Sequence, residues 1–173
     1  MSGPSIVIPV HINLQFTQSN GGAACTCVVT EYRYHDSDTY DIEVEMFSID
    51  DTMVQMTELV RSYRNYHLNR VHMEPAEVRE CKEKARIAKD TFRAMFRGLI
   101  DDEQFLINDP EDAVLRTLRS WAEQTYPSPI GERRVGLTQE ECADILPQLT
   151  SEQTSAEEPA VWPYVRKVKY VLT

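Results

Sequence analysis

The sequence has no apolar run of the roughly 18–20 residues that a membrane-spanning helix needs. It is also short of positive charge, since 18 Lys and Arg stand against 28 Asp and Glu for a net charge of −10. Proteins that bind duplex nucleic acid need a positive field to displace counterions, so this balance argues against that class. We expect neither a membrane span nor a nucleic-acid partner. With 173 residues and 42% hydrophobic content, the chain suits a single domain.

The signatures of common catalytic sites are missing as well. The six glycines form neither G-x-x-x-x-G-K-[ST] nor G-x-G-x-x-G, and there is no G-x-S-x-G or H-E-x-x-H. Asp36, Asp38 and Asp41 crowd one turn, but no downstream Glu stands in register to complete a calcium loop. We therefore assign no catalytic residue and do not expect self-contained catalysis.

Cysteine is scarce, with four residues in the chain, and the cysteines form no metal-binding pattern. Cys25 and Cys27 flank Thr26 in an apolar run that indicates a strand, where their side chains would point to opposite faces. Without a C-x-x-C motif or a nearby histidine, buried reduced thiols are the simpler interpretation. The first residues lack the basic and apolar regions of a secretory signal, so we expect an intracellular protein of the cytoplasm or nucleus.

Alternating patterns predict strands near both ends of the chain. Residues 12–16, 26–34 and 40–47 have strand patterns, and the turn-forming His35–Asp38 suggests that the last two pair as an antiparallel hairpin. A final strand is expected over Val165–Leu172. Residues 31–60 carry nine acidic side chains against Arg33 alone, whereas residues 61–99 carry ten basic against five acidic. A surface this dipolar could steer an anionic partner, but we favour solvated helix faces with i,i+4 pairs.

Helical periodicity dominates the middle of the chain and predicts about four helices. The first follows Asp50 or Asp51 as cap, the second runs from Pro75 to about Gly98, the third follows Asp109-Pro110, and the fourth opens with the capping box Thr138–Glu141. Residues 125–136 are expected to form a loop and residues 150–161 a linker. The fold class predicted is thus α+β: N-terminal strands in a hairpin, a helical insertion and a C-terminal strand.

The second helix carries a narrow apolar seam. Its members alternate in steps of three and four: Val78, Cys81, Ala85, Ala88, Phe92, Met95 and Leu99. Such a seam packs on one partner helix. We favour a helical hairpin with residues 50–68 of the same chain, and keep a partner helix or self-association as the alternative.

Two segments stand out, Gly21–Tyr34 (GGAACTCVVTEYRY) and Trp162–Leu172 (WPYVRKVKYVL). They resemble parts of dynamin-like large GTPases, in particular fungal P-loop proteins related to the animal nuclear GTPase of germinal-centre cells. Gly21–Tyr34 resembles the family's C-T-x-V-x-T-E-x-x-Y run at switch I. Trp162–Leu172, WPYVRKVKYVL, resembles its W-P-x-[VI]-x-x-[VIK]-x-V-x-L strand, and Phe96–Phe105 resembles a stretch of its helical insertion. The resemblance spans about residues 17–172 and is most specific at the two ends.

The resemblance implies a partial GTPase domain of the P-loop α/β class over residues 1–173. Residues 17–48 would hold switch I and strands, 49–149 the helical insertion, 150–161 a linker and 162–173 the last strand. In the family, GTP and Mg²⁺ are bound with help from a switch threonine. The match assigns that role, including the metal contact, to Thr26, with Thr30 as the other candidate. The glycines Gly21 and Gly22 would let the switch segment move.

The chain lacks the family's remaining nucleotide-binding motifs. Residues 1–16 do not resemble the phosphate loop, and neither D-x-x-G nor [NT]-K-x-D occurs. We therefore expect a GTPase fragment, a truncated product or a degenerate paralogue that binds no cofactor by itself and hydrolyses no GTP. Exposed strand edges would make it marginally stable or self-associating. The alternative function is a stand-alone helical interaction module acting through the seam over residues 78–99.

Overall fold

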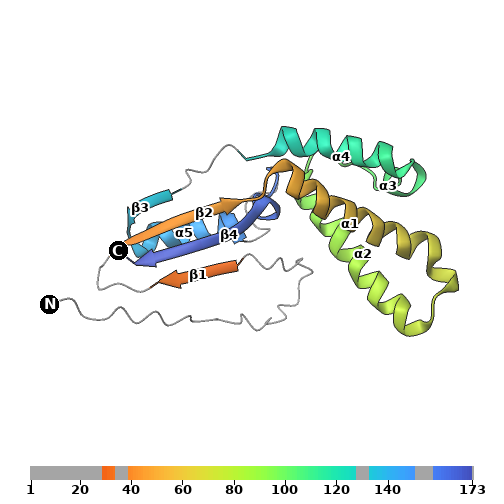
Figure 1. The fold of residues 1–173 in the computed structure, drawn as a ribbon, viewed down its shortest axis with the longest axis horizontal. Coiled ribbons are helices and arrows are strands. Elements are labelled where there is room, and N and C mark those ends of the chain that lie inside the picture. The colour runs from red at the N-terminus through yellow and green to blue at the C-terminus, as the bar shows by residue number, and fades with distance from the viewer. Residues whose placement is uncertain (1–28, 34–38, 128–132, 151–157, 173) are drawn as a thin grey trace.

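The computed structural model describes residues 29–33, 39–127, 133–150 and 158–172. Its elements are β1 (Val29–Arg33), β2 (Tyr40–Met46), α1 (Ile49–Asn69), α2 (Pro75–Met95), α3 (Phe105–Asn108), α4 (Glu111–Thr125), β3 (Arg133–Leu137), α5 (Gln139–Thr150) and β4 (Val165–Leu172). A sheet with α5 forms one part of the molecule and α1–α4 form the other (Figure 1). The predicted α+β class is confirmed. In the described residues, every helix is too short or too polar to span a bilayer.

The sheet is mixed, with strand order β1-β4-β2-β3. β4 runs parallel to β1 and antiparallel to β2, and β2 is also antiparallel to β3. The expected hairpin between the first two strands is therefore wrong, because β4 lies between them. The predicted strand over residues 12–16 lies outside the described residues.

Charge explains why β4 separates the two strands. β2 carries Glu43 and Glu45, which stand in register with Lys169 and Lys167 of β4. Lys169 Nζ donates to Glu43 Oε1 at 3.1 Å. Opposite charges facing each other across strands stabilise a sheet and like charges destabilise it. A direct pairing of β1 with β2 would instead have placed the acidic β2 beside a strand that carries one Glu and one Arg and so offers a single base.

The helical hairpin of α1 and α2 forms within the chain, as favoured from the seam. Four residues in the middle of the seam are fully buried: Ala85, Ala88, Phe92 and Met95. They pack with the buried face of α1, made by Met56, Val60 and Tyr63, and with Val114 and Leu118 of α4. Charged residues on the outer faces pair as expected at i,i+4, as in Lys84–Glu80 at 2.6 Å and Arg86–Asp90 at 2.9 Å.

Local capping chemistry sets most helix starts. Pro75 occupies the first turn of α2, and the Glu141 carboxylate accepts from the Thr138 amide at 2.8 Å, completing the predicted capping box of α5. The cap of α1 is Ser48, whose Oγ accepts from the Asp51 amide at 3.1 Å, so the expected aspartate cap is displaced by two or three residues. Gly98 follows the end of α2 in a turn, with φ +79°.

Three further boundaries differ from the sequence prediction. β3 lies where a loop was expected, held by pairing with β2 rather than by any pattern of its own. The four-residue α3 is too short to show helical periodicity. The predicted linker is not free of the core either, because the Ala160 amide donates to the Ala94 carbonyl at 2.8 Å and Ala160 is buried.

We predict that Phe92→Ala lowers the free energy of unfolding by about 3–5 kcal/mol, because the ring is fully buried between helices and its removal leaves a cavity. Urea titration followed by circular dichroism measures the change. Ile87→Ala is the matched control, since Ile87 lies on the same helix with 37% of its surface exposed, and should cost about 1 kcal/mol or less. Equal losses from the two variants would contradict this core.

Candidate functional site

Of the two threonines assigned by resemblance, the structure describes one. Thr26 lies outside the described residues. Thr30 is the second residue of β1, where it stands in register with Val168 of β4. In open α/β sheets, ligands bind beyond the carboxyl ends of parallel strands. The carboxyl ends of β1 and β4 meet where Arg33 pairs with Val171, and Thr30 lies toward the opposite end of β1.

A buried carboxylate lies at this carboxyl edge. Asp41 of β2 stands in register with Val171, and its Oδ1 accepts a hydrogen bond from the Gly136 amide at 3.0 Å. Gly136 has φ +70°, a conformation that favours glycine, beside an irregularity in the β2–β3 pairing. Asp41 thus holds β3 on the sheet. Sequence analysis had grouped Asp41 with the turn aspartates, because its hydrogen-bonding partner lies 95 residues away and leaves no local signal in the sequence.

Opposite charges form a row across the sheet. The register partners Glu31, Lys169, Glu43 and Arg133 connect all four strands in turn. The intervening residues Ile42 and Val44 of β2 are buried with Cys142 and Leu149 of α5. One face of β2 is therefore apolar and packs on α5, whereas the other carries Glu43 and Glu45.

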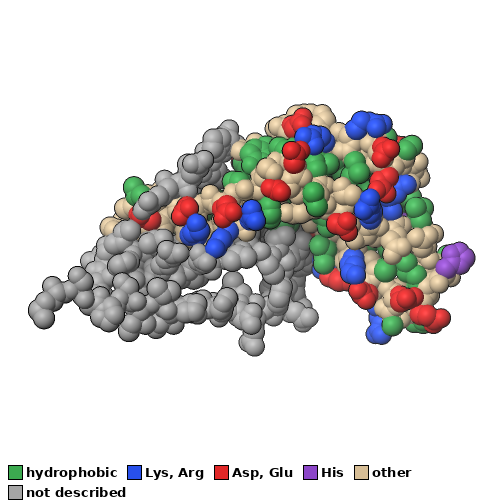
Figure 2. All heavy atoms as spheres, viewed as in Figure 1, with side chains coloured by type: hydrophobic (Ala, Val, Ile, Leu, Met, Phe, Trp, Pro, Cys, Tyr) green, Lys and Arg blue, Asp and Glu red, His purple; other side chains and the backbone are tan. Residues whose placement is uncertain are grey.

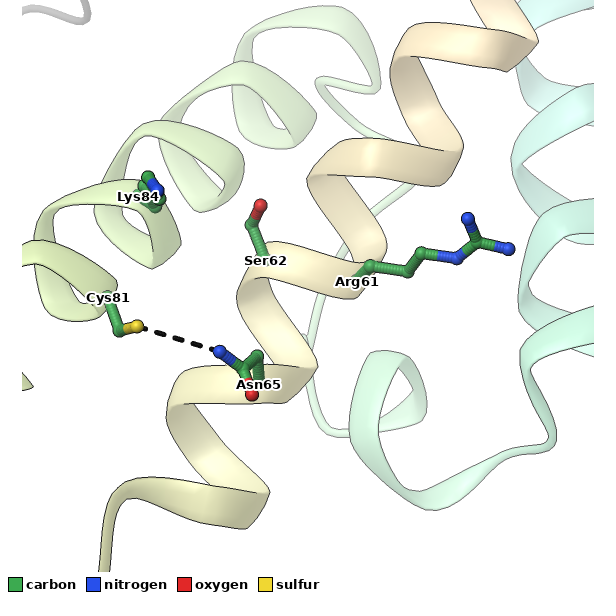
Figure 3. Close-up of a pocket in the computed structure, with 5 residues that line it drawn as sticks. All are labelled: Arg61, Ser62, Asn65, Cys81 and Lys84. Atoms are coloured by element: carbon green, nitrogen blue, oxygen red, sulfur yellow. Dashed lines mark hydrogen bonds between the residues drawn. The ribbon is translucent and has the colours of Figure 1, made fainter. Parts of the chain in front are cut away.

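A shallow pocket opens between α1 and α2 (Figure 3). It has a volume of about 260 Å³ and is lined by Arg61, Ser62, Asn65, Cys81 and Lys84. The Asn65 amide nitrogen lies 3.5 Å from Cys81 Sγ, bridging the two helices. Figure 3 shows that the Arg61 side chain points away from Cys81. It donates instead to Glu111 of α4 at 3.1 Å.

The pocket offers a thiol but no free acid or base. Lys84 is hydrogen-bonded to Glu80, and this bond together with the glutamate's charge raises the lysine pKa and lowers that of Glu80. A lysine whose pKa is raised stays protonated near neutral pH and cannot serve as a general base. Within the described ranges, no three His, Cys, Asp or Glu side chains gather closely enough to hold a metal ion. The pocket is therefore better suited to a binding contact than to a catalytic role.

An ion-pair cluster holds the chain after α2. Glu103 pairs with Arg93 and, at 3.6 Å, with Lys89. Burial raises the pKa of Glu103, but the bond from Arg93 and the two positive charges outweigh it, so the net pKa is lowered. Burial raises the pKa of the nearby Tyr63 hydroxyl, and the charge of Glu103 adds to that rise. This cluster has a structural role, because the Glu103 carboxylate is already paired with Arg93 and Lys89.

The helices and the sheet meet at a hydrogen-bonded junction. The Phe47 amide donates to the Tyr164 carbonyl at 2.8 Å, and the Tyr126 hydroxyl donates to the Phe47 carbonyl at 2.7 Å. The Tyr164 hydroxyl lies 2.6 Å from Thr125 Oγ1, and the rings of Tyr126 and Tyr164 meet edge to face at 5.3 Å. The end of β2, the end of α4 and the start of β4 are thereby tied together. Sequence analysis missed these residues because their partners lie far along the chain.

Comparison with known proteins gives no match to this chain among protein-family models, curated proteins or solved structures. The resemblance to dynamin-like GTPases therefore stays a prediction.

We predict that stability falls between pH 10 and about pH 12 through Tyr164. Burial raises the pKa of Tyr164 from 10.0 to about 12, against a smaller lowering by the bond with Thr125. Because the folded pKa is above the unfolded value, this contribution is fully present below pH 10 and is lost as pH rises through the folded pKa. Tyr164→Phe should flatten that decline and cost about 1 kcal/mol at neutral pH. Urea titrations across this range test it; parallel pH profiles for the two proteins would contradict it.

Proposed function

We propose that this chain is part of a dynamin-like GTPase domain, consisting of the switch I region and a helical insertion, without autonomous GTP hydrolysis. The two motifs at residues 21–34 and 162–172 support the proposal from the sequence. The same proposal puts the protein in the cytoplasm or nucleus, where Cys81 and Cys142, both free thiols, stay reduced.

The observation that carries the proposal is the bond between the Phe47 amide and the Tyr164 carbonyl. β2 and β4 are neighbours in the sheet, yet the whole helical part separates them in sequence. The chain leaves the sheet after β2, returns to it as β3, which pairs with β2, and passes through α5 before Tyr164 brings it back to the end of β2. This is the arrangement of an insertion between two adjacent strands of a sheet domain. The parallel pairing of β1 with β4 also suits an α/β nucleotide-binding sheet, where parallel strands are the rule.

The charged face limits where these strands could lie in such a domain. Strands in the middle of a doubly wound sheet need apolar residues on both faces. β2 instead alternates the buried Ile42 and Val44 with the more exposed Glu43 and Glu45. In the proposed parent domain, β2 and β3 would therefore belong to the periphery of the sheet.

The described residues do not fit a bound nucleotide by themselves. The sequence has no phosphate loop, and the carboxylate of Asp41 lies at the edge where phosphates would approach. Like charges repel, so this edge disfavours a phosphate unless other groups supply positive charge. In the proposal, Thr26 contacts Mg²⁺ and the γ-phosphate only when a phosphate loop is supplied, with Thr30 as the other candidate. We assign no catalytic step to this chain.

A helical interaction module acting through residues 78–99 is the second candidate. The burial of Ala85, Ala88, Phe92 and Met95 inside the hairpin removes most of that seam from partners. Val78 and Cys81, at the end of the seam near the turn of the hairpin, are half-buried and stay accessible without opening the hairpin, whereas Leu99 at the other end packs against the core. A module of this kind would therefore act through the end of the hairpin.

Calorimetry with Mg²⁺ and a non-hydrolysable GTP analogue tests the first proposal. We predict no binding by the chain of 173 residues. A longer protein that includes the flanking coding sequence should contain G-x-x-x-x-G-K-[ST] upstream and D-x-x-G downstream, and should bind. In that protein, Thr26→Ala should weaken Mg²⁺-dependent binding about tenfold or more, and Thr26→Ser should restore it, because the hydroxyl is the ligand.

Two outcomes would count against this proposal. Stoichiometric, Mg²⁺-dependent binding by the chain alone would show that it has a phosphate site of its own. Flanking coding sequence that lacks the two motifs would contradict the proposal that the chain belongs to a larger GTPase. Thr30→Ala in the longer protein is the matched control, because equal losses from both threonine variants would not support the assignment to Thr26.

A further inference from the structure

The end of the helical hairpin has no core of its own. Between Tyr63 in α1 and Ala85 in α2, every side chain is exposed or only half-buried. Leu68, near the end of α1, and Val71, in the 3₁₀ turn that follows, are 52% and 83% exposed. We call residues 67–84, within this stretch, the arm tip. Figure 1 shows it at the end of the molecule away from the sheet.

Local interactions hold the helices of the arm tip only weakly. The Glu77 carboxylate accepts from the Glu74 amide at 3.0 Å in a capping box, and Lys84 pairs with Glu80. Caps and exposed ion pairs each contribute little compared with the conformational entropy that is lost when the backbone becomes ordered. Most helices in proteins are stabilised by packing of an apolar face. An arm tip with exposed Leu68 and Val71 therefore gains stability when another surface covers it.

The charges of the arm tip limit which kind of partner surface can bind to it. Residues 67–84 carry equal numbers of opposite charges, four basic and four acidic: Arg70, Arg79, Lys82, Lys84, Glu74, Glu77, Glu80 and Glu83. Figure 2 shows both signs interspersed over this end of the molecule. An anionic membrane or nucleic acid needs a net positive patch, and a strongly basic partner needs a net negative one. Neither fits a balanced surface.

We propose that the arm tip binds the arm tip of a second copy of this chain. A two-fold axis brings the same patch of each copy together, which requires a self-complementary surface. Two copies with a net charge of −10 each repel one another over most of their surface. The charge-balanced arm tip is where they can approach with least repulsion, burying Leu68 and Val71 of both. This proposal does not depend on the nucleotide proposal.

Sedimentation equilibrium of the full chain under reducing conditions tests the proposal. The wild type should form a reversible dimer, and Val71→Glu should raise its dissociation constant about tenfold or more, because a charge replaces an apolar contact at the centre of the interface. Val54→Glu is the matched control: Val54 lies on α1 outside the arm tip and is 67% exposed. It should change the dissociation constant by no more than about twofold.

Leu68→Ser provides a second variant, and circular dichroism confirms that each protein is folded. A dimer weakened by Val71→Glu or Leu68→Ser but not by Val54→Glu supports the proposal. A wild type that stays monomeric at roughly 100 μM would overturn the proposal. Binding of that monomer to phosphatidylserine vesicles would not restore it, because the proposed partner is a second copy of the chain. A dimer that all three variants leave unchanged would also overturn it, because another surface would then mediate association.

Discussion

The pairing of β2 with β4 is the constraint on which the rest of the structure depends. The two strands are neighbours in the sheet although the whole helical part separates them in sequence. Bringing such distant segments together has an entropic cost that grows slowly with loop length and must be offset by contacts. The helical core offsets it, because α1, α2 and α4 pack on one another and bring the end of α4 back to the end of β2. The Phe47 amide and the hydroxyls of Tyr126 and Tyr164 then close the junction.

Each part of the molecule uses a different force. In the sheet, the basic β4 pairs with the acidic β2, and Ile42, Val44 and Val168 are buried with residues of α5. In the helical part, hydrophobic packing dominates near the junction and fades toward the arm tip, where Leu68 and Val71 face solvent. Stability should follow the same gradient, since local opening is easiest where buried apolar contacts are few. The two proposals concern different parts of the molecule: the sheet with its switch region and the arm tip.

The sequence was most informative where structure is set by near neighbours. Pro75 and the Thr138–Glu141 capping box mark helix starts because their hydrogen-bonding partners lie within one turn. The order of the strands could not be read in this way, since β4 inserts between β1 and β2 from far along the chain. β3 and α3 are too short to carry a period. Among site residues, Asp41 and Tyr164 have partners 95 and 39 residues away, and Thr26 was singled out by resemblance alone. The uneven charge of residues 31–60 did contain a clue, because the acidic β2 is stabilised by a basic neighbour.

Native-state hydrogen exchange of individual amides is the most direct test of the junction. If the β2–β4 pairing and the helical core support each other, the amides of Phe47 and Val168 should exchange only by global unfolding, with the same protection free energy as the amide of Phe92. Amides of residues 68–72, at the arm tip, should exchange by local opening at a much lower free energy. If Phe47 and Val168 instead exchange as fast as the arm tip while Phe92 stays protected, the sheet opens independently of the helices and the account is contradicted.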